Sequence, residues 1–191
     1  MMPTKPELRK KYRELRSQLS LEEIEKKSLA IANRALSEDI WKGTYYHLFL
    51  SIAQKREIDT GFMLSVLHGK DKQVVVPKSD FRNYTLEHLL LEEETVLRIK
   101  SYGIPEPDSG EPVDPELIDV VFIPLLAYDK RGYRVGYGKG FYDRFLKDCR
   151  KDVIKVGLSF FGPEEEIPDI NPHDIPVDLV VTPDRCYRFS T

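Results

Sequence analysis

The feature that most restricts the fold of this chain is a set of five short apolar runs, rich in β-branched and aromatic residues. They are TYYHLFLSI (44–52), QVVVP (73–77), DVVFIP (119–124), VIKVGLSF (153–160) and LVVT (179–182). None alternates strictly between apolar and polar residues, which is typical of parallel strands that are covered on both faces. All are far shorter than the roughly 20 apolar residues that a membrane-spanning helix needs.

Segments with apolar residues at helical spacing lie before and between these runs. They predict helices over 6–19, 21–36, 60–68 and 140–149. Ser20 and Glu23 form a capping box, which satisfies free backbone N–H groups at the start of the second helix. Strands that alternate with helices predict a single α/β domain over residues 1–191, a three-layer α/β/α sandwich with a mainly parallel central sheet. The Pro- and Gly-rich stretch 103–115 is expected to be an ordered loop within this domain.

Charge and cysteine content argue against several kinds of partner. The net charge is −3, so neither nucleic acid nor an anionic membrane is expected, although residues 1–16 carry six basic and only two acidic side chains. The N-terminus lacks the apolar core of a secretory signal. Cys149 and Cys186 lie far apart and in no CxxC motif, which favours free thiols and argues against zinc. We expect a cytoplasmic protein, and also a monomer.

The most informative segment, DKRGYRVGYGKGFYD, follows the run DVVFIP and leads into the last predicted helix. Gly136, Gly138 and Gly140 alternate there, so the backbone can adopt positive φ values and approach a ligand without obstruction by a Cβ atom. Free N–H groups at the helix start form a cradle for phosphate, and Arg134 and Lys139 add positive charge. The segment is neither a Walker A loop nor a GxGxxG motif. The simpler interpretation is a tight turn with a solvated lysine.

Asp143 lies in the first turn of that predicted helix, where a carboxylate is favourable in any protein. Beside a triphosphate it would be repelled unless a cation lay between the two. Mg²⁺ uses one or two carboxylates together with phosphate oxygens. The position of Asp143 is therefore also consistent with a metal bridge.

The segment RVGYGKGFYDRFL (134–146) resembles the signature of 5-formyltetrahydrofolate cyclo-ligases, also called 5,10-methenyltetrahydrofolate synthetases. Further landmarks of that family occur in the same order, namely KPELR (5–9), EIDT (57–60), VPK (76–78), GIPEP (103–107), VGLSF and HDIPVDLVVT. The resemblance implies a sandwich similar to the NagB/RpiA/CoA-transferase-like proteins. It also implies an enzyme that uses ATP and Mg²⁺ to convert 5-formyltetrahydrofolate into 5,10-methenyltetrahydrofolate, ADP and phosphate.

The resemblance further implies roles for individual residues. For ATP binding it implies Lys5, Arg9, Arg134, Val135, Gly136, Tyr137, Gly138, Lys139, Gly140, Phe141 and Tyr142. For folate binding it implies Arg9, Glu57, Tyr102, Tyr137, Gly138, Lys139, Gly140 and Phe141. Arg134 and Lys139 would be catalytic, and Asp143 and Asp174 would bind Mg²⁺. Glu57 would form hydrogen bonds with the pterin ring.

The chain departs from the family pattern in some positions. Tyr137 replaces an Arg that some relatives have, and a Gln expected soon after VGLSF is missing. The spacing between Leu50 and Glu57 is longer than in some relatives. Contacts with ligands in these two stretches are therefore not carried over from the family.

Simpler interpretations remain open for some of these residues. Lys5 and Arg9, one helical turn apart, can face one ligand together or form a solvated basic face. Glu57 can be a surface acid at a strand end. The acidic run Glu164–Glu166 is expected to be solvated.

Other residues and functions are also open. His47, His68 and His88 show no partner spacing and are expected to be structural or exposed. A non-catalytic folate or nucleotide binder of the same fold is an alternative function, and so is a sugar-phosphate isomerase. A nucleic-acid-binding domain is disfavoured by the negative net charge.

Overall fold

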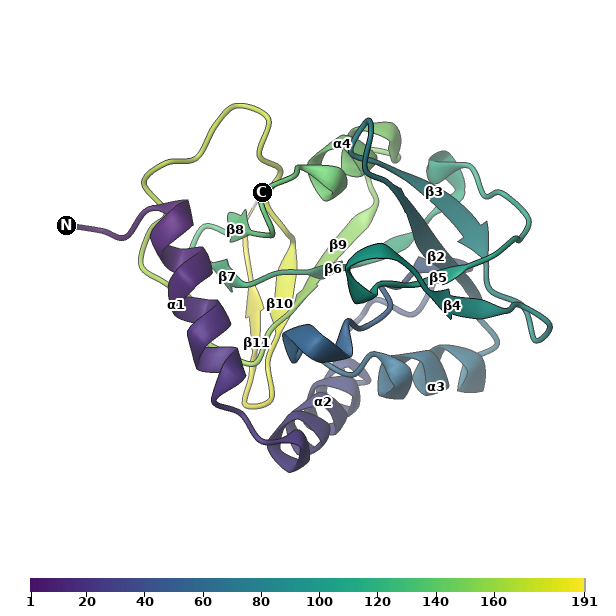
Figure 1. Ribbon diagram of the computed structural model, residues 1–191, viewed down its shortest axis with the longest axis horizontal. Helices are drawn as coiled ribbons and strands as arrows, with labels where there is room; N and C mark the ends of the chain where they lie inside the picture. Colours follow the sequence, from purple (N-terminus) through teal and green to yellow (C-terminus); the bar gives the residue numbers. More distant parts are fainter. Residues whose placement is uncertain (191) are drawn as a thin grey trace.

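The computed structural model describes residues 1–190, and a seven-stranded sheet forms its centre (Figure 1). Along the sheet the strands follow the order β11 (Cys186–Arg188), β10 (Leu179–Val181), β9 (Ile154–Leu158), β6 (Val120–Pro124), β1 (Tyr45–His47), β2 (Gln73–Asp80) and β3 (Thr85–Leu90). The five central strands run parallel, whereas β3 and β11 pair antiparallel at the two edges. The prediction of a mainly parallel sheet is confirmed.

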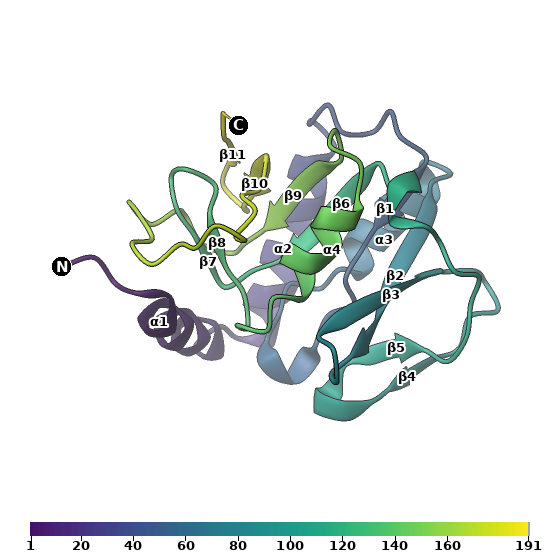
Figure 2. The ribbon, with the colours of Figure 1, turned by 90° about the horizontal axis from the view of Figure 1, so that it is seen from above.

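Three helices cover the two faces of the sheet. Helices α2 (Leu21–Ala35) and α3 (Gly61–Gly69) lie on one face, and α4 (Phe141–Asp148) lies on the other (Figures 1 and 2). Phe122 of β6 packs in the apolar core shared with α2 and α3, whereas its neighbour Val121 packs in the core that contains Phe145 of α4. Strand β6 is thus apolar on both faces, which explains its continuous apolar run. The three-layer α/β/α sandwich is confirmed.

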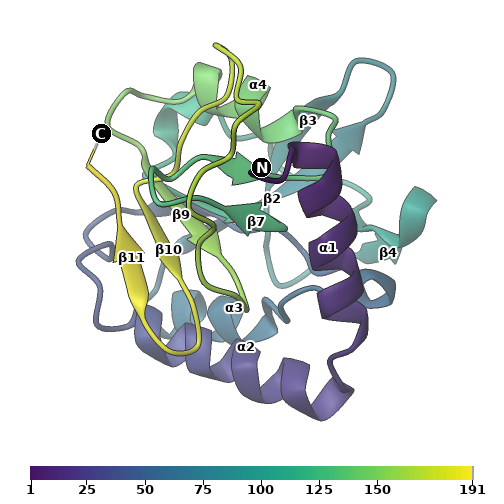
Figure 3. The same ribbon diagram turned by 90° about the vertical axis from the view of Figure 1, so that its left-hand side faces the viewer.

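Helix α1 (Lys5–Ser17) lies beside the sheet rather than on one of its faces (Figure 3). A capping box of Thr4 and Glu7 stabilises its start. Leu8 and Tyr12 pack in a third apolar cluster with residues of the small ribbon formed by β7 (Ala127–Tyr128) and β8 (Arg134–Val135). Because β8 begins the glycine-rich segment, this packing places α1 beside it.

The first apolar run forms less strand than predicted. Strand β1 ends at His47, and the following residues leave the sheet, although the Leu48 N–H still donates to the Val75 carbonyl at 2.9 Å. Leu48, Phe49 and Ile52 are nevertheless buried. The run is apolar throughout because the segment after the strand also belongs to the core.

The Pro- and Gly-rich stretch 103–115 is only partly the loop that we expected. It contains β5 (Pro105–Pro107), which pairs with β4 (Leu97–Ile99), and it ends at a 3-10 turn, η3 (Pro115–Leu117). Short 3-10 turns also lie at η1 (Ala53–Lys55) and η2 (Ser101–Gly103). All three residues of β4 are exposed, so no buried face marks this strand in the sequence.

The structure confirms one expectation for polar residues and changes another. His47 and His88 are buried and structural, as expected, and their rings pack edge to face with centroids 5.2 Å apart, although their spacing in the sequence does not indicate a pair. Glu164 is not simply solvated, because it accepts hydrogen bonds from Lys11 at 2.6 Å and from Tyr12 at 2.8 Å. It thereby ties α1 to the body of the protein.

The direction in which the chain proceeds along the sheet reverses between β1 and β6. From β1 the chain continues to β2 on one side, and from β6 it continues to β9 on the other. In open α/β sheets, ligands bind outside the carboxyl ends of the strands at such a reversal. The segment after β1 leads to Glu57, and the segment after β6 contains the glycine-rich loop, so both lie at this edge. No helix among residues 1–190 is long and apolar enough to cross a membrane.

Candidate active site

A cleft with a volume of about 960 Å³ lies at this edge of the sheet. Its lining comes from α1, the segment after β1, the ends of β2 and β6, the glycine-rich loop with α4, and the segment 169–174. Every residue that the family resemblance assigns to ATP, folate or Mg²⁺ lines this cleft except Val135. The Val135 side chain is buried in the cluster with Leu8 and Tyr12, so it does not face a ligand in the cleft.

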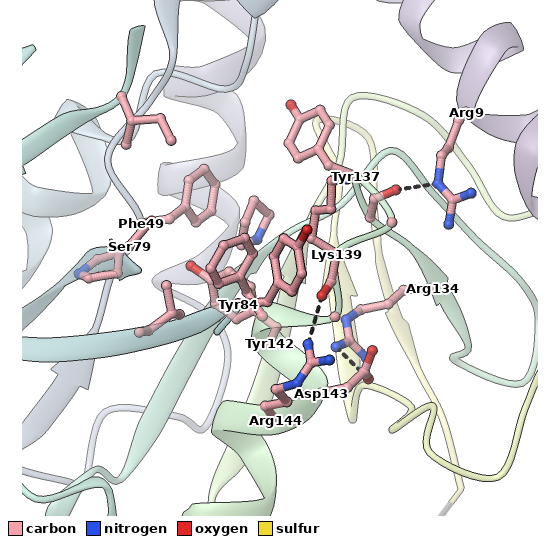
Figure 4. A pocket seen from close by; sticks show the side chains of 18 of the residues that line it. Arg9, Phe49, Ser79, Tyr84, Arg134, Tyr137, Lys139, Tyr142, Asp143 and Arg144 are labelled. Carbon is pink, nitrogen blue, oxygen red and sulfur yellow. Dashed lines mark hydrogen bonds and ion pairs between the residues drawn. The ribbon is translucent and has the colours of Figure 1, made fainter. Parts of the chain in front are cut away.

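The glycine-rich loop bends around the end of the Arg9 side chain (Figure 4). Gly138 has a φ of +92°, and a Cβ atom built on it would lie 3.1 Å from Cζ of Arg9. Both the backbone conformation and the close approach therefore favour glycine. Arg9 Nε donates a hydrogen bond to the Gly136 carbonyl at 2.9 Å, and its other N–H groups have no partner among residues 1–190. The interpretation of Lys5 and Arg9 as a solvated basic face is wrong, since both side chains line the cleft.

Arg134 and Asp143 form an ion pair at the start of α4, with Nη2 and Oδ1 2.9 Å apart (Figure 4). The same Asp143 oxygen accepts the Ile175 N–H at 3.1 Å, and Arg134 also donates to the Ile175 carbonyl. The Arg134 side chain is only 7% exposed. The guanidinium therefore balances the charge of Asp143 and fixes its orientation.

A second ion pair joins Lys5 of α1 to Asp174. Asp174 also accepts the Asn171 N–H at 2.8 Å, and Asp169 accepts the Lys5 N–H at 2.9 Å. These contacts attach the start of α1 to the segment 169–174. They also bring Asp174 into the same cleft as Asp143, next to Ile175, whose N–H binds Asp143.

Lys139 differs from these cations because its side chain is exposed and forms no ion pair in the part of the chain that the structure describes. Its Nζ lies 5.5 Å from the centre of the Tyr84 ring. Its carbonyl accepts a hydrogen bond from Arg144 at 2.7 Å, which fixes the backbone but not the ammonium group (Figure 4). We refer to Lys5, Arg9, Arg134 and Lys139 as the cationic wall of the cleft.

Glu57 is buried at 6% exposure, so its interpretation as a surface acid is wrong. One carboxylate oxygen accepts the Ile52 N–H at 2.7 Å, and the other accepts the hydroxyl of Tyr137. Burial and the nearby charge of Glu57 raise the pKa of Tyr137, so the phenol is a stable hydrogen-bond donor. Glu57 also lines the cleft, and these two hydrogen bonds fix the position of its carboxylate.

The cleft is also lined by four neighbouring aromatic side chains, Phe81, Tyr84, Tyr102 and Phe141, which we call the aromatic wall. The centroid of the Phe81 ring lies 4.8 Å from that of Tyr102 and 5.3 Å from that of Phe141. Tyr102 is 70% exposed, which leaves its ring accessible to a planar ligand. Sequence reasoning missed Phe81 and Tyr84, although aromatic residues directly after the carboxyl end of β2 are a usable signal.

The residues present fit a magnesium ion that is held mainly by a nucleotide. Among the described residues, no cluster of three or more His, Cys, Asp or Glu side chains could hold a metal. Mg²⁺ needs only one or two carboxylates when phosphates and water supply the other oxygens. Asp143 and Asp174 line one cleft, and Oδ2 of Asp143 has no partner among residues 1–190, so these two carboxylates suffice.

The fold and the cleft define the class. This is an α/β protein whose cleft, at the reversal point of a mainly parallel sheet, is lined by a glycine-rich cationic wall and an aromatic wall. A cleft of that kind can hold a phosphorylated ligand beside a planar ring.

Comparison with known proteins identifies the family. The model of the 5-formyltetrahydrofolate cyclo-ligase family matches residues 1–183. The NMR structure of 5,10-methenyltetrahydrofolate synthetase from Aquifex aeolicus is 34% identical and superposes with a TM-score of 0.81, covering 98% of this chain and 93% of that chain. The 5-formyltetrahydrofolate cyclo-ligase of Mus musculus is 27% identical over 177 residues, 87% of each chain. The synthetase of Mycoplasma pneumoniae, 24% identical, shares the fold with a TM-score of 0.73 over 94% of this chain and 98% of that chain.

The chain therefore belongs to the 5-formyltetrahydrofolate cyclo-ligase family, and with it to the ligases of folate one-carbon metabolism. The resemblance seen in the sequence is confirmed.

Proposed function

We propose that this chain catalyses the ATP- and Mg²⁺-dependent cyclisation of 5-formyltetrahydrofolate to 5,10-methenyltetrahydrofolate, with release of ADP and phosphate. The observation that carries the proposal is the meeting of three elements in one cleft. The Arg9 guanidinium lies against Gly138, the glycine-rich loop opens helix α4, and the buried Glu57 carboxylate faces the same space. The first two suit phosphates, and the third suits a pterin ring.

The chemistry requires activation of an amide. The oxygen of the formyl group that nitrogen 5 carries attacks the γ-phosphorus of ATP, and the bond between that phosphorus and the ADP oxygen breaks. The product of this step is an iminium phosphate. Nitrogen 10 then attacks the formyl carbon and loses its proton, and departure of phosphate leaves the methenyl bridge. No nucleophile of the protein is needed, so the protein contributes alignment and charge compensation.

The cationic wall would bind the phosphates. Arg9 and Lys139 have N–H groups without partners among residues 1–190, so both can donate to phosphate oxygens directly. Arg134 is largely buried, and its part is to orient Asp143 and to add positive charge behind the loop. Lys5 would exchange part of its contact with Asp174 for a phosphate oxygen. The backbone N–H groups of the loop would position the nucleotide.

Asp143 and Asp174 would hold Mg²⁺ together with phosphate oxygens. Bound there, the ion would offset negative charge on the β- and γ-phosphates. Because Arg134 fixes Asp143 and Lys5 fixes Asp174, both carboxylates are oriented before any ligand arrives.

The folate would lie between Glu57 and the aromatic wall. The Glu57 carboxylate can accept hydrogen bonds from two adjacent N–H donors of the pterin. Phe81 and Tyr102 can stack on the pterin rings. We propose one domain for the whole chain. Its cytoplasmic location and its monomeric state stay predictions from the sequence.

The decisive test is an absorbance assay for the methenyl product, run on the purified chain with and without ATP. Product should form only when 5-formyltetrahydrofolate, ATP and Mg²⁺ are all present, with one ADP released for each product. A folded chain that binds both substrates but forms no product would be the non-catalytic binder of the same fold.

The metal assignment has its own test. Asp143→Asn keeps an oxygen for Arg134 and Ile175 but removes the charge, so the Mg²⁺ concentration for half-maximal rate should rise about tenfold. Asp152→Asn, which alters an exposed carboxylate outside the cleft, is the control. An unchanged magnesium titration in a folded Asp143→Asn protein would remove this residue from the metal site.

A further inference from the structure

Arg16 is a buried charged residue that none of the roles above explains. It lies on α1 and is only 7% exposed. Its Nε has no hydrogen-bond partner among residues 1–190, and its Nη2 donates to the hydroxyl of Tyr137 at 2.8 Å. Burial of a guanidinium costs free energy unless an anion compensates it. Its contact with a neutral phenol therefore needs a reason.

The Tyr137 hydroxyl connects Arg16 to the Glu57 carboxylate. A hydroxyl can accept one hydrogen bond and donate another at the same time. The Tyr137 hydroxyl accepts from Arg16 and donates to Oε1 of Glu57. Arg16, Tyr137 and Glu57 thus form a chain of hydrogen bonds that connects a buried cation to a buried carboxylate, and each bond in such a chain polarises the next.

Arg16 does not line the cleft itself. Glu57 and Tyr137 do, and Arg16 and Glu57 together line a separate small cavity of about 10 Å³. A substrate in the cleft would therefore touch Glu57 and Tyr137 but not Arg16. Any effect of Arg16 on the substrate therefore has to pass through Tyr137 and Glu57.

Glu57 keeps capacity for a ligand within this arrangement. Each carboxylate oxygen can accept about two hydrogen bonds. One oxygen already accepts from Ile52 at 2.7 Å and the other accepts from Tyr137. Both oxygens can still accept one more donor, and the two existing bonds fix the plane of the carboxylate.

The ring of Tyr137 is held independently of its hydroxyl. Lys55 Nζ lies 4.1 Å from the ring centre, Cζ of Arg13 lies 5.7 Å from it, and Cζ of Arg16 lies 5.8 Å from it. Arg16 also binds the hydroxyl, whereas Lys55 and Arg13 contact only the π-system. Removal of the hydroxyl should therefore interrupt the chain of hydrogen bonds while the ring stays in place.

We propose that Arg16 is a positioning residue for the folate substrate. Through the Tyr137 hydroxyl it holds the Glu57 carboxylate in the orientation that accepts two adjacent N–H donors of the pterin ring. The inference rests on the proposed function and adds to it a residue that does not touch the substrate.

The test uses Arg16→Met, Tyr137→Phe and the double variant in the methenyl assay. Each single variant should raise the KM for 5-formyltetrahydrofolate about tenfold, since a hydrogen bond to a charged group is lost. The KM for ATP should stay within about twofold, because the loop backbone is intact. The KM of the double variant for 5-formyltetrahydrofolate should equal the higher of the two single-variant values, because both substitutions interrupt the same chain of hydrogen bonds. Arg16→Lys, which keeps the charge and one donor, should recover part of the loss.

A matched control lies on the same helix. Tyr12→Phe also removes a tyrosine hydroxyl that donates to a glutamate, at 2.8 Å from Glu164, but Tyr12 does not line the cleft. It should leave the KM for folate within about twofold of the wild type.

Three outcomes would overturn the inference. A folded Arg16→Met protein with the wild-type KM for folate would do so, as would equal increases in the KM values for both substrates. The third is a double variant whose loss is the product of the single losses. If the wild-type chain forms no methenyl product at all, the proposed function fails first and this inference with it. An active wild type with an unaffected Arg16→Met protein would refute only the inference.

Discussion

The two walls of the cleft are held in place by different kinds of contact. On the cationic wall, Lys5 pairs with Asp174, Arg9 bonds to the Gly136 carbonyl and Arg134 pairs with Asp143. The aromatic wall consists of rings that pack on one another, and Tyr102 at its edge is 70% exposed. Three of the four cations are fixed by directional bonds, whereas the aromatic wall is held by non-directional packing.

This difference matches what each proposed ligand requires. Charge that develops during phosphoryl transfer is stabilised best by groups whose positions are fixed beforehand, because no reorganisation is then needed. A planar ring needs area and shape rather than exact donors, and stacked aromatic side chains supply both. Three further predictions follow, from the largest expected effect to the smallest. The first and the last test whether the walls have these separate tasks, and the second concerns the core under α4, the helix that carries Phe141 of the aromatic wall.

Lys139 should show the largest effect, because its ammonium group has no ion-pair partner among the described residues, whereas Lys5 and Arg134 are paired with carboxylates. The whole charge of Lys139 is therefore available to a phosphate oxygen. Lys139→Ala should lower kcat about 100-fold, in the range known for loss of one donor to a transition-state oxygen. The thermal unfolding temperature should not change, since the side chain is exposed.

The control is Lys130→Ala, which removes an exposed lysine paired with Glu165 outside the cleft. Its kcat should equal that of the wild type. Wild-type turnover in a folded Lys139→Ala protein would show that the fixed members of the cationic wall are sufficient.

The buried histidines under α4 should make stability depend on pH. Burial lowers the pKa of His88 to about 4, and burial together with the charge of His88 lowers the pKa of His47. The unfolded chain binds protons at these sites below pH ~6.5, whereas the folded chain does not. Stability is therefore full above that pH and falls as the pH decreases towards 4, by about 2 kcal/mol at pH 5 from His88 alone. His47 adds a loss of the same sign.

Helix α4 should be the first element affected, because Phe145 stacks on His88 with ring centroids 4.0 Å apart. The same helix begins with Phe141 of the aromatic wall. Thermal unfolding of the wild type and of His88→Gln between pH 7 and pH 5 measures the effect. The variant should lose less stability on acidification, and parallel curves for the two proteins would contradict this prediction.

The smallest effect is expected at the exposed edge of the aromatic wall. Tyr102→Ala should raise the KM for 5-formyltetrahydrofolate about fivefold, the loss typical of one aromatic contact, with the KM for ATP unchanged. Tyr102→Phe keeps the ring and should behave as the wild type. Tyr102 has a φ of +62°, a conformation that alanine shares without extra strain relative to tyrosine. An increase in the KM for ATP alone would mean that the two walls do not divide the ligands as proposed.

Much of the fold could be predicted because its signals are local. The apolar runs locate the parallel strands, and the capping box at Ser20 and Glu23 marks the start of α2 as expected. Strand β4 could not be found in this way, since its residues are all exposed. The strand β1 was predicted too long because buried loop residues and buried strand residues have the same composition.

The candidate site could also be predicted only in part from the sequence. The glycine-rich loop was evident from Gly136, Gly138 and Gly140, whose spacing needs no tertiary information. The residues that contact the side chains of this loop were not evident from the sequence. Tyr137 and Glu57 are 80 residues apart, and Arg16 and Tyr137 are 121 apart, so no local pattern connects them.

The sequence by itself determined the five parallel strands, the four helices, the glycine-rich loop and the family, because each depends on residues that are neighbours along the chain. Only the tertiary structure decided which charges pair, that Glu57 is buried, and that four aromatic residues form one wall. The physical reason is that side-chain contacts depend on distance in space. The reversal of the chain between β1 and β6 brings segments that are remote in the sequence to one edge of the sheet.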